Sequence, residues 1–389
     1  MLLTKINKKM TTKEKPWIRM DNKKYVVILE TSHFQYVITQ MEIFSDCYLF
    51  IITTPTLEKE ILEFAPEAYK HRYISINSIK ENKKKIIKFI KSFPFDLFLI
   101  NPVFDDYGAL NKIVRKCSFT KVITTHNINT WFNGRFWSPK SLMDRLNMRS
   151  IIRHCDYVAV EDFIYHYLKS SNHQLFHKHK FLYIPFTIFH PDRPKKFTKP
   201  DNRLRVVLPG YIDGDRRHYE DVLEMIKHFI QQSNQITFIF AGRANGEYGK
   251  MIVQKLQKIQ ALYPTLVSFF DDKSTPDMFR QAMETSDLVL SASNITFKGM
   301  GTTEYIGKTK PTAAIHDMIT YQLPGLLPHH LLIPHNLQGS AFNYSSVDEL
   351  TIVLENLLLN PSVLFEWKAK AQLNSLNYTA EIIRKGLPF

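Results

Sequence analysis

The chain has 389 residues, of which 44% are hydrophobic and 13% aromatic, and it carries a formal net charge of +14. A single hydrophobic core rarely organises so long a chain, so these values predict two domains. Its three cysteines, Cys47, Cys117 and Cys155, form no CxxC pair, and no histidines cluster at metal-ligand spacing, which argues against a disulfide framework or a structural zinc. No apolar run reaches the roughly 18–20 residues of a spanning helix, and no signal-peptide segment is found, so we expect a cytoplasmic protein.

The positive charge is concentrated in the first half of the chain. Residues 1–200 contain 33 Lys and Arg against 18 Asp and Glu, whereas residues 201–389 contain 18 against 19. A basic surface attracts the phosphates of nucleic acid, of anionic lipid or of a phosphorylated substrate, so charge alone does not choose among these partners. The basic segments lack the aromatic pattern of an RNA-binding motif, and we expect no nucleic-acid partner.

The first half alternates β-branched strand segments with amphipathic helical segments. Residues 1–22 read as a flexible basic tail with little to pack. The strands predicted after this tail cover residues 24–30, 47–54, 96–102, 121–127 and 156–161. Residues 78–93 predict an amphipathic helix with a crowded lysine face, which fits either an outer helix of the domain or a helix that lies on an anionic membrane.

The same alternation restarts after a passage rich in Pro and Lys at residues 190–203. Strands are predicted at 205–210, 236–243, 266–271 and 287–293, and the tail reads as helices, the first capped by Ser346 with Glu349 completing a capping box. Strands that alternate with helices indicate parallel sheets. We therefore predict an α/β fold of two Rossmann-like domains facing across a cleft. The first covers residues 23–200 and the second 201–389, with a last helix that could pack back on the first.

Two segments of the second half suit a bound diphosphate. Gly210 ends the strand at 205–210, and Arg216 and Arg217 follow where a guanidinium could hold phosphates. In the second segment, residues 304–328, a proline marks a helix start. The exposed amides of such a start, together with Thr309, Lys310 and Thr312, would surround a phosphate.

A histidine lies at the end of a predicted strand of the first half. His126 and Asn127 follow the strand at 121–127, and loops at strand ends face the cleft. A histidine can take a proton from a hydroxyl, or it can simply be a structural residue. His33 follows the first strand, whose turn lacks the glycines of a dinucleotide fingerprint, so a dehydrogenase is not expected.

These segments resemble those of the glycosyltransferases of the B-type fold, particularly family 4. In that family the glycine ending the first strand of the second domain is followed six residues later by a lysine that neutralises the donor phosphates. Counted from Gly210, this position is Arg216, and Tyr211 replaces the arginine usual after the glycine. An acidic residue seven positions before a proline binds the donor ribose, and here it is Asp317.

The resemblance also marks one departure. Thr309 stands where family 4 has a glutamate, and Glu304 and Lys308 are the nearby candidates for the donor-sugar contact. By the same resemblance, His126 and Arg216 are the expected catalytic residues, and His33 and Asn127 are expected on the acceptor side.

The function implied by the resemblance is transfer of a sugar from a UDP- or GDP-linked donor to an acceptor hydroxyl. Family members need no cofactor, and with no DxD motif in the sequence we expect no metal. The implied acceptor is a glycan or a lipid-linked glycan of the cell surface, with possible contact to the inner face of an anionic membrane. Two alternatives stay open, a UDP-sugar 2-epimerase of the same fold and a non-enzymatic protein that binds RNA or an anionic surface.

Overall fold

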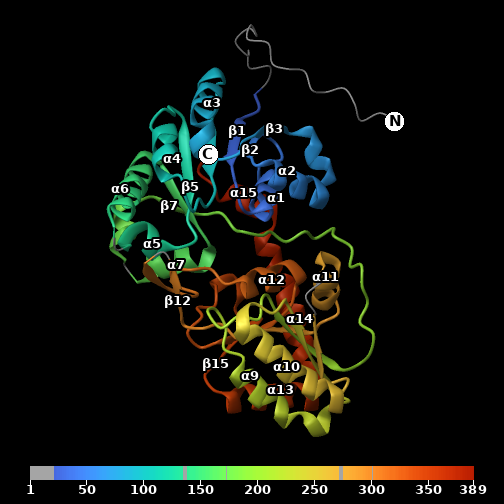
Figure 1. Cartoon of the computed structure of the whole chain (residues 1–389). Coiled ribbons are helices and arrows are strands. Elements are labelled where there is room, and N and C mark those ends of the chain that lie inside the picture. The colour runs from blue at the N-terminus through green and yellow to red at the C-terminus, as the bar shows by residue number, and fades with distance from the viewer. Residues whose placement is uncertain (1–21, 135–137, 172, 271–274, 300) are drawn as a thin grey trace.

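The computed structural model describes residues 22–134, 138–171, 173–270, 275–299 and 301–389. Two α/β domains lie one above the other, each built on a parallel sheet (Figure 1). This arrangement confirms the predicted pair of Rossmann-like domains. Apart from residue 22, the predicted basic tail lies outside the described residues.

The sheet of the first domain has seven parallel strands in the order β3-β2-β1-β4-β5-β6-β7. Its central strands read as continuous apolar runs, because helices cover both faces of a parallel sheet. The strands are β1 (Tyr25–Leu29), β2 (Tyr48–Thr53), β3 (Arg72–Ser75), β4 (Leu97–Ile100), β5 (Thr120–Thr124), β6 (Tyr157–Val160) and β7 (Phe181–Tyr183). The helices of this domain are α1 (Phe34–Ile43), α2 (Pro55–Phe64), α3 (Ile79–Ser92), α4 (Tyr107–Val114), α5 (Ile128–Asn133), α6 (Pro139–His154), α7 (Asp162–Ser170) and α8 (Gln174–Lys178).

The second sheet repeats the same winding with six parallel strands in the order β10-β9-β8-β11-β14-β15. These are β8 (Leu204–Pro209), β9 (Ile236–Ala241), β10 (Val267–Phe269), β11 (Leu288–Leu290), β14 (Gly325–Pro328) and β15 (Ala341–Tyr344), with an antiparallel hairpin of β12 (Thr296–Gly299) and β13 (Thr302–Tyr305) beside them. The helices are α9 (Glu220–His228), α10 (Gly246–Leu262), α11 (Pro276–Glu284), α12 (Ala313–Tyr321), α13 (Val347–Leu359), α14 (Pro361–Ser375) and α15 (Ala380–Lys385).

Both sheets reverse their strand order at one point, between β1 and β4 in the first and between β8 and β11 in the second. Parallel sheets bind ligands outside the carboxyl ends of the strands at such switch points. The turns that leave β1, β8 and β11 are therefore the ones that matter for function.

Local sequence signals explain how several helices begin. Ser78 caps α3 by accepting a hydrogen bond from the Glu81 amide at 3.1 Å, and Ser346 caps α13 in the same way through the Glu349 amide at 3.1 Å. The predicted capping box at α13 is incomplete, because the Glu349 carboxylate accepts from the amide of Ser345, one residue before the cap. Among the described helices, none is both long and apolar enough to cross a bilayer.

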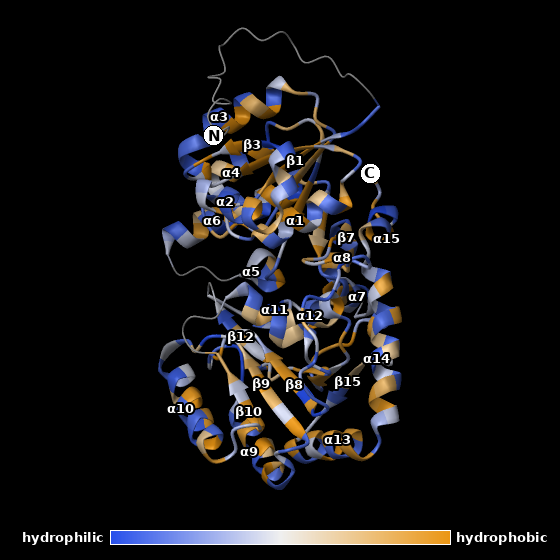
Figure 2. Cartoon of the chain, turned by 90° about the vertical axis from the view of Figure 1, so that its right-hand side faces the viewer, coloured by the Kyte–Doolittle hydropathy of each residue, from blue (hydrophilic) through white to orange (hydrophobic). Residues whose placement is uncertain are grey.

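The end of the chain returns to the first domain. Helix α14 runs along the second domain and α15 lies against the first (Figures 1 and 2). Ile383 is buried in the same core cluster as Val26 of β1, and the Tyr378 hydroxyl donates to the Asp162 carboxylate at 3.0 Å. The two domains are therefore joined twice, by the segment that leads into β8 and by this returning segment.

Candidate functional site

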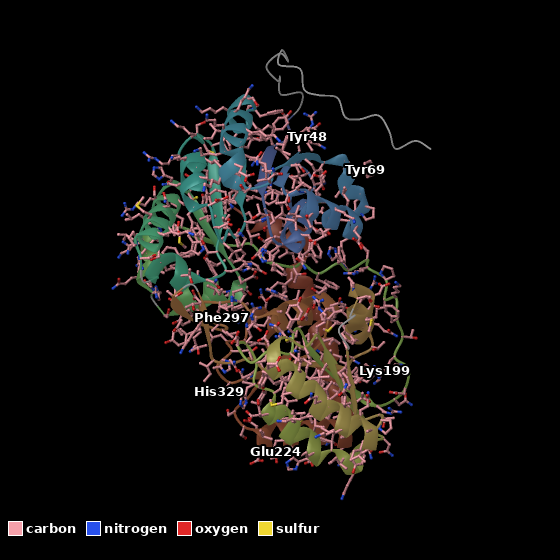
Figure 3. The ribbon with its side chains drawn as sticks, viewed as in Figure 1. Tyr48, Tyr69, Lys199, Glu224, Phe297 and His329 are labelled. Carbon is pink, nitrogen blue, oxygen red and sulfur yellow. The ribbon has the colours of Figure 1, made fainter. Side chains whose placement is uncertain are left out.

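The candidate site lies where the carboxyl ends of the two sheets approach each other. Figure 3 shows Phe297, on β12, at the edge of the second domain that faces the first. The hairpin β12–β13 and the loop that precedes α12 reach from the second domain onto α5. Most residues predicted to hold the donor lie on these elements or on the turn after β8.

The turn after β8 is shaped by Gly210 and Arg217. Gly210 has a φ of +93°, and a Cβ there would lie 2.2 Å from Nη2 of Arg217, so only glycine fits. The Arg217 guanidinium donates to the carbonyls of Tyr211 at 2.8 Å and of Pro209 at 3.0 Å. Arg217, one of the two arginines predicted to bind phosphate, therefore stabilises the turn through these hydrogen bonds.

Arg216 and Lys310 point to one place. The Arg216 guanidinium lies 5.4 Å and the Lys310 ammonium 4.6 Å from the centroid of the Phe297 ring. Lys310 also donates to Oδ1 of Asn127 at 2.9 Å, and neither cation forms an ion pair with a carboxylate among the described residues. Burial, followed by repulsion from Arg216, lowers the pKa of Lys310 to about 8.

The start of α12 is open to a ligand. Thr312 is its N-cap residue, but no side chain caps the helix, and the first turn carries no acidic residue. Ser293, in the segment that follows β11, lies beside it, with Oγ 3.5 Å from Oγ1 of Thr312. The backbone of Arg217 bridges to Ser293, so the turn after β8 lies close to the positive end of this helix.

Asp317 lies further along α12, in the field of Arg217. Burial raises the pKa of its carboxyl to about 7, while His316 and Arg217 act in the opposite direction. The residue that ends this helix, Gln322, has a φ of 55° in the left-handed region, where the family-like turn before Pro324 would more easily hold a glycine. Gln322 therefore adopts a left-handed backbone conformation that glycine adopts more easily.

Glu304 has a structural task in the described arrangement. Its buried carboxylate accepts from the amides of Asn129 at 3.1 Å and Thr130 at 2.7 Å, and from the Thr130 hydroxyl at 2.9 Å. The Ile128 amide donates to the Thr309 carbonyl at 3.0 Å. All three first-turn amides of α5, a helix of the first domain, are thus satisfied by groups of the second.

Thr309 and Lys308 also take part in local structure. The Thr309 hydroxyl accepts from the Tyr305 amide at 2.8 Å and is buried. Lys308 lies near His330, whose pKa is lowered by burial first and more weakly by His329 and by this lysine. The Thr309 hydroxyl is therefore engaged in the backbone turn that precedes Lys310.

On the first domain, His33 and His126 come together. Their ring centroids are 5.3 Å apart, and His126 also lies 5.2 Å from the ring of Tyr36. Burial lowers the pKa of His126 well below its ordinary value, and the neighbouring His33, Lys310 and His316 lower it further. A histidine in such surroundings is a neutral contact residue and a poor proton acceptor.

The sequence analysis missed the groups that join the two domains around these histidines. His316 of α12 lies 3.2 Å from the Glu161 carboxylate, which also accepts from the Tyr36 hydroxyl at 3.3 Å, and the His316 ring stacks on Phe186 at 5.1 Å. Glu161 directly follows β6, so its place just after a strand was the available signal. Phe297 and His316 gave no signal, because their partners are distant in sequence.

Metal ligands are not grouped in the described part of the chain: no set of three or more His, Cys, Asp or Glu side chains is placed to hold an ion.

Comparison with solved structures identifies the fold. No protein-family model matches the sequence, and no match is found among curated proteins. A glycosyltransferase of Rickettsia africae aligns with a TM-score of 0.61 and 13% identity, over 94% of this chain and 97% of that one. HepE of Anabaena in complex with UDP aligns at 0.62 and 14%, over 93% and 97%. Sucrose-phosphate synthase of Thermosynechococcus elongatus aligns at 0.58 and 12%, over 93% and 97%.

These similarities cover nearly the full length of both chains. The chain has the fold of the B-type glycosyltransferases, as the resemblance predicted. At these identities the likeness establishes the fold, and membership of family 4 remains a hypothesis.

Proposed function

We propose that the protein is a glycosyltransferase that uses a nucleotide-diphosphate sugar as donor. The observation that carries the proposal is the pair Arg216 and Lys310, two cations that face one ring without a carboxylate partner among the described residues. Two like charges held together in a partly buried place are unfavourable, and an anion between them removes that cost. A diphosphate has the matching charge.

Two further features support this proposal. The open start of α12 supplies amides for the phosphates, and Asp317 supplies a carboxylate that can accept from both ribose hydroxyls. In transfer, negative charge grows on the departing diphosphate, so Arg216 and Lys310 would stabilise the transition state more than the bound donor. The structures of HepE with UDP, and with UDP and glucose, are consistent with a uridine donor.

The test is binding and turnover of nucleotide sugars. We expect UDP or GDP to raise the melting temperature, with a stabilisation of about 2.7 kcal/mol at a hundred times the dissociation constant. Replacing Arg216 by Ala removes a charge-assisted contact and is expected to weaken binding about 10- to 100-fold. Arg153→Ala, an equal change of charge at an exposed position of α6, is the control and should bind normally.

Two results would contradict the proposal. If no nucleotide stabilises the protein, the donor site is wrong. If UDP-GlcNAc alone yields ManNAc and UDP without an acceptor, the protein is instead an epimerase of the same fold.

We further propose that the acceptor is a glycan or glycolipid presented at an anionic membrane. What supports this is the outer face formed by α3, α4 and α6, which are neighbours (Figure 1). On α6 three apolar side chains are exposed to water, Leu142, Met143 and Leu146. Exposed cations lie on the three helices: Lys80, Lys84, Lys85, Lys88, Lys91, Lys112, Lys140 and Arg149.

Sedimentation with vesicles tests this surface. Each lysine near an anionic bilayer contributes about 1 kcal/mol, so replacing Lys84 and Lys88 by Glu should reduce binding to phosphatidylglycerol vesicles by at least about tenfold. Lys227→Glu, on α9 of the second domain, is the control. Equal binding of the wild-type protein to phosphatidylcholine and phosphatidylglycerol vesicles would contradict the proposal.

A further inference from the structure

The turn after β1 carries a buried carboxylate, Glu30, of which one oxygen accepts hydrogen bonds and the other does not. Oε1 of Glu30 accepts from the amides of Thr31 at 2.8 Å, Ser32 at 2.7 Å and His33 at 3.1 Å. Oε2 is buried and has no hydrogen-bond partner among the residues that the structure describes, and Glu30 is only 1% exposed. An unpaired buried carboxylate oxygen is costly, so it calls for a functional explanation.

His33 lies against this carboxylate. Its Nδ1 is 3.7 Å from Oε1 of Glu30 and has no hydrogen-bond partner, while 27% of its side chain is exposed. Nδ1 itself is buried, so the exposed part of the side chain belongs to its other atoms, and Nε2 is the ring nitrogen left to accept a proton. The ring is held in place by Phe104 at 5.6 Å and by His126 at 5.3 Å between centroids.

A closer approach of Nδ1 to this carboxylate, which lies 3.7 Å away, would give the arrangement of a general base with an orienting carboxylate. A proton on Nδ1 directed at Glu30 leaves the Nε2 lone pair free to accept a proton from a hydroxyl, and Glu30 stabilises the imidazolium that forms. Such contacts are commonly long before a substrate binds and tighten in the reacting complex. The groups that act electrostatically on His126 are His33, Lys310 and His316, and all three disfavour its protonated form.

The other half of the site offers little support for a covalent or substrate-assisted route on the donor side. Thr309 occupies the position where the resemblance expects a glutamate, and both oxygens of Glu304 are bound to α5. A single displacement needs neither of these carboxylates; it needs a base on the acceptor side.

We propose that His33 is the catalytic base of this glycosyltransferase, that Glu30 is its positioning residue, and that transfer inverts the configuration of the sugar. The proposal rests on the proposed function. The acceptor hydroxyl gives its proton to Nε2 of His33 as its oxygen forms a bond to the anomeric carbon. The bond from that carbon to the diphosphate oxygen breaks, and the nucleoside diphosphate leaves with the electron pair beside Arg216 and Lys310.

The stereochemistry of the product is the first test. The protein is incubated with UDP-glucose, UDP-GlcNAc or GDP-mannose, chosen by thermal shift, and with methanol as a small acceptor. Proton NMR then identifies the anomer of the methyl glycoside, or of the free sugar first released where water is the acceptor. We expect α-linked donors to give β products. Retained configuration overturns the proposal and leaves glycosyl transfer itself intact, whereas no binding and no turnover contradict the proposed function as well.

Chemical rescue distinguishes a base from a structural histidine. His33→Ala should lower kcat at least 100-fold with little change in the KM for the donor. Added imidazole should raise the kcat of this variant at least tenfold. His154→Ala, on the outer helix α6, should change neither value. A full loss that imidazole cannot restore would overturn the assignment of the base.

Glu30→Gln tests the positioning role. The amide oxygen can still accept from the three backbone amides, so the turn is kept while the charge beside the imidazolium is lost. We expect a 10- to 100-fold lower kcat with the KM for the donor and the melting temperature almost unchanged. An unchanged kcat would remove Glu30 from the mechanism.

Discussion

At the scale of single residues, sequence reasoning found the types of residue that matter but not how their side chains are used. Arg216 and Arg217 are adjacent and chemically equal, yet Arg217 holds the backbone of its own turn, and Arg216 faces Phe297. Glu304 was a candidate for the donor sugar and is enclosed against α5. These outcomes depend on tertiary contacts, which no local pattern encodes.

Lys310 should take up a proton when the donor binds. Its pKa of about 8 is lowered by burial and by Arg216, and a diphosphate reverses the second effect, so the pKa rises in the complex. At pH 8 we expect uptake of up to about half a proton per UDP bound. Calorimetry in two buffers of different ionisation enthalpy measures it. Lys310→Arg is the control and should show no uptake, and the same uptake in this variant would contradict the assignment.

Asp317→Asn should make the unliganded protein more stable and the complex weaker. The folded pKa, about 7, is above the ordinary value of 3.8, so between these pH values the folded state binds more protons and stability falls as pH rises. The neutral amide avoids this loss, and we expect a melting temperature about 2–4 °C higher at pH 8 with little gain at pH 4. Affinity for UDP should fall about tenfold. A lower melting temperature at pH 8 would contradict this account.

At the scale of elements, most strands and helices were predicted from their apolar runs and periodicity, and several short strands were missed. The strands β3, β7 and the hairpin β12–β13 have three or four residues each, too few to show a period. The hairpin matters most, because it places Glu304 at the start of α5. Residues 130 and 304 are far apart in the chain, and capping rules apply only to neighbours in sequence.

Removing the Glu304 carboxylate should loosen α5 and the contact between the domains. Glu304→Ala leaves the backbone amides of Asn129 and Thr130 without their acceptors, which is expected to lower the free energy of unfolding by about 2–4 kcal/mol. Hydrogen exchange at Asn129 and Thr130 should become faster. Glu304→Gln keeps an accepting oxygen and should lose less. Unchanged exchange at these amides in the alanine variant would show that the cap is dispensable.

At the scale of the whole molecule, the winding of two parallel sheets was predictable, because alternating strands and helices leave few other arrangements. From the sequence, the return of α15 to the first domain was only one possibility, because its few apolar residues do not indicate which surface the helix packs against. In the structure Ile383 enters the core beside Val26, and Phe389 lies 6.3 Å from the Phe44 ring.

Ile383→Ala should therefore destabilise the first domain although the residue lies in the last helix. Truncating a buried isoleucine costs about 2–5 kcal/mol, and exchange protection should fall first in β1 and α1. Its neighbour Ile382 is 46% exposed, and Ile382→Ala should change stability by less than about 0.5 kcal/mol. Urea denaturation of both variants measures the difference. Equal effects would mean that α15 does not contribute to this core.

The return of α15 also sets the order in which the protein can fold during synthesis. Val26 and Ile383 are neighbours in one core but are more than 350 residues apart in the chain. The ribosome makes the whole second domain before it makes the helix that completes the first. Until then the apolar face of β1 and α1 lacks its last cover, and we expect the nascent chain to need protection there from aggregation.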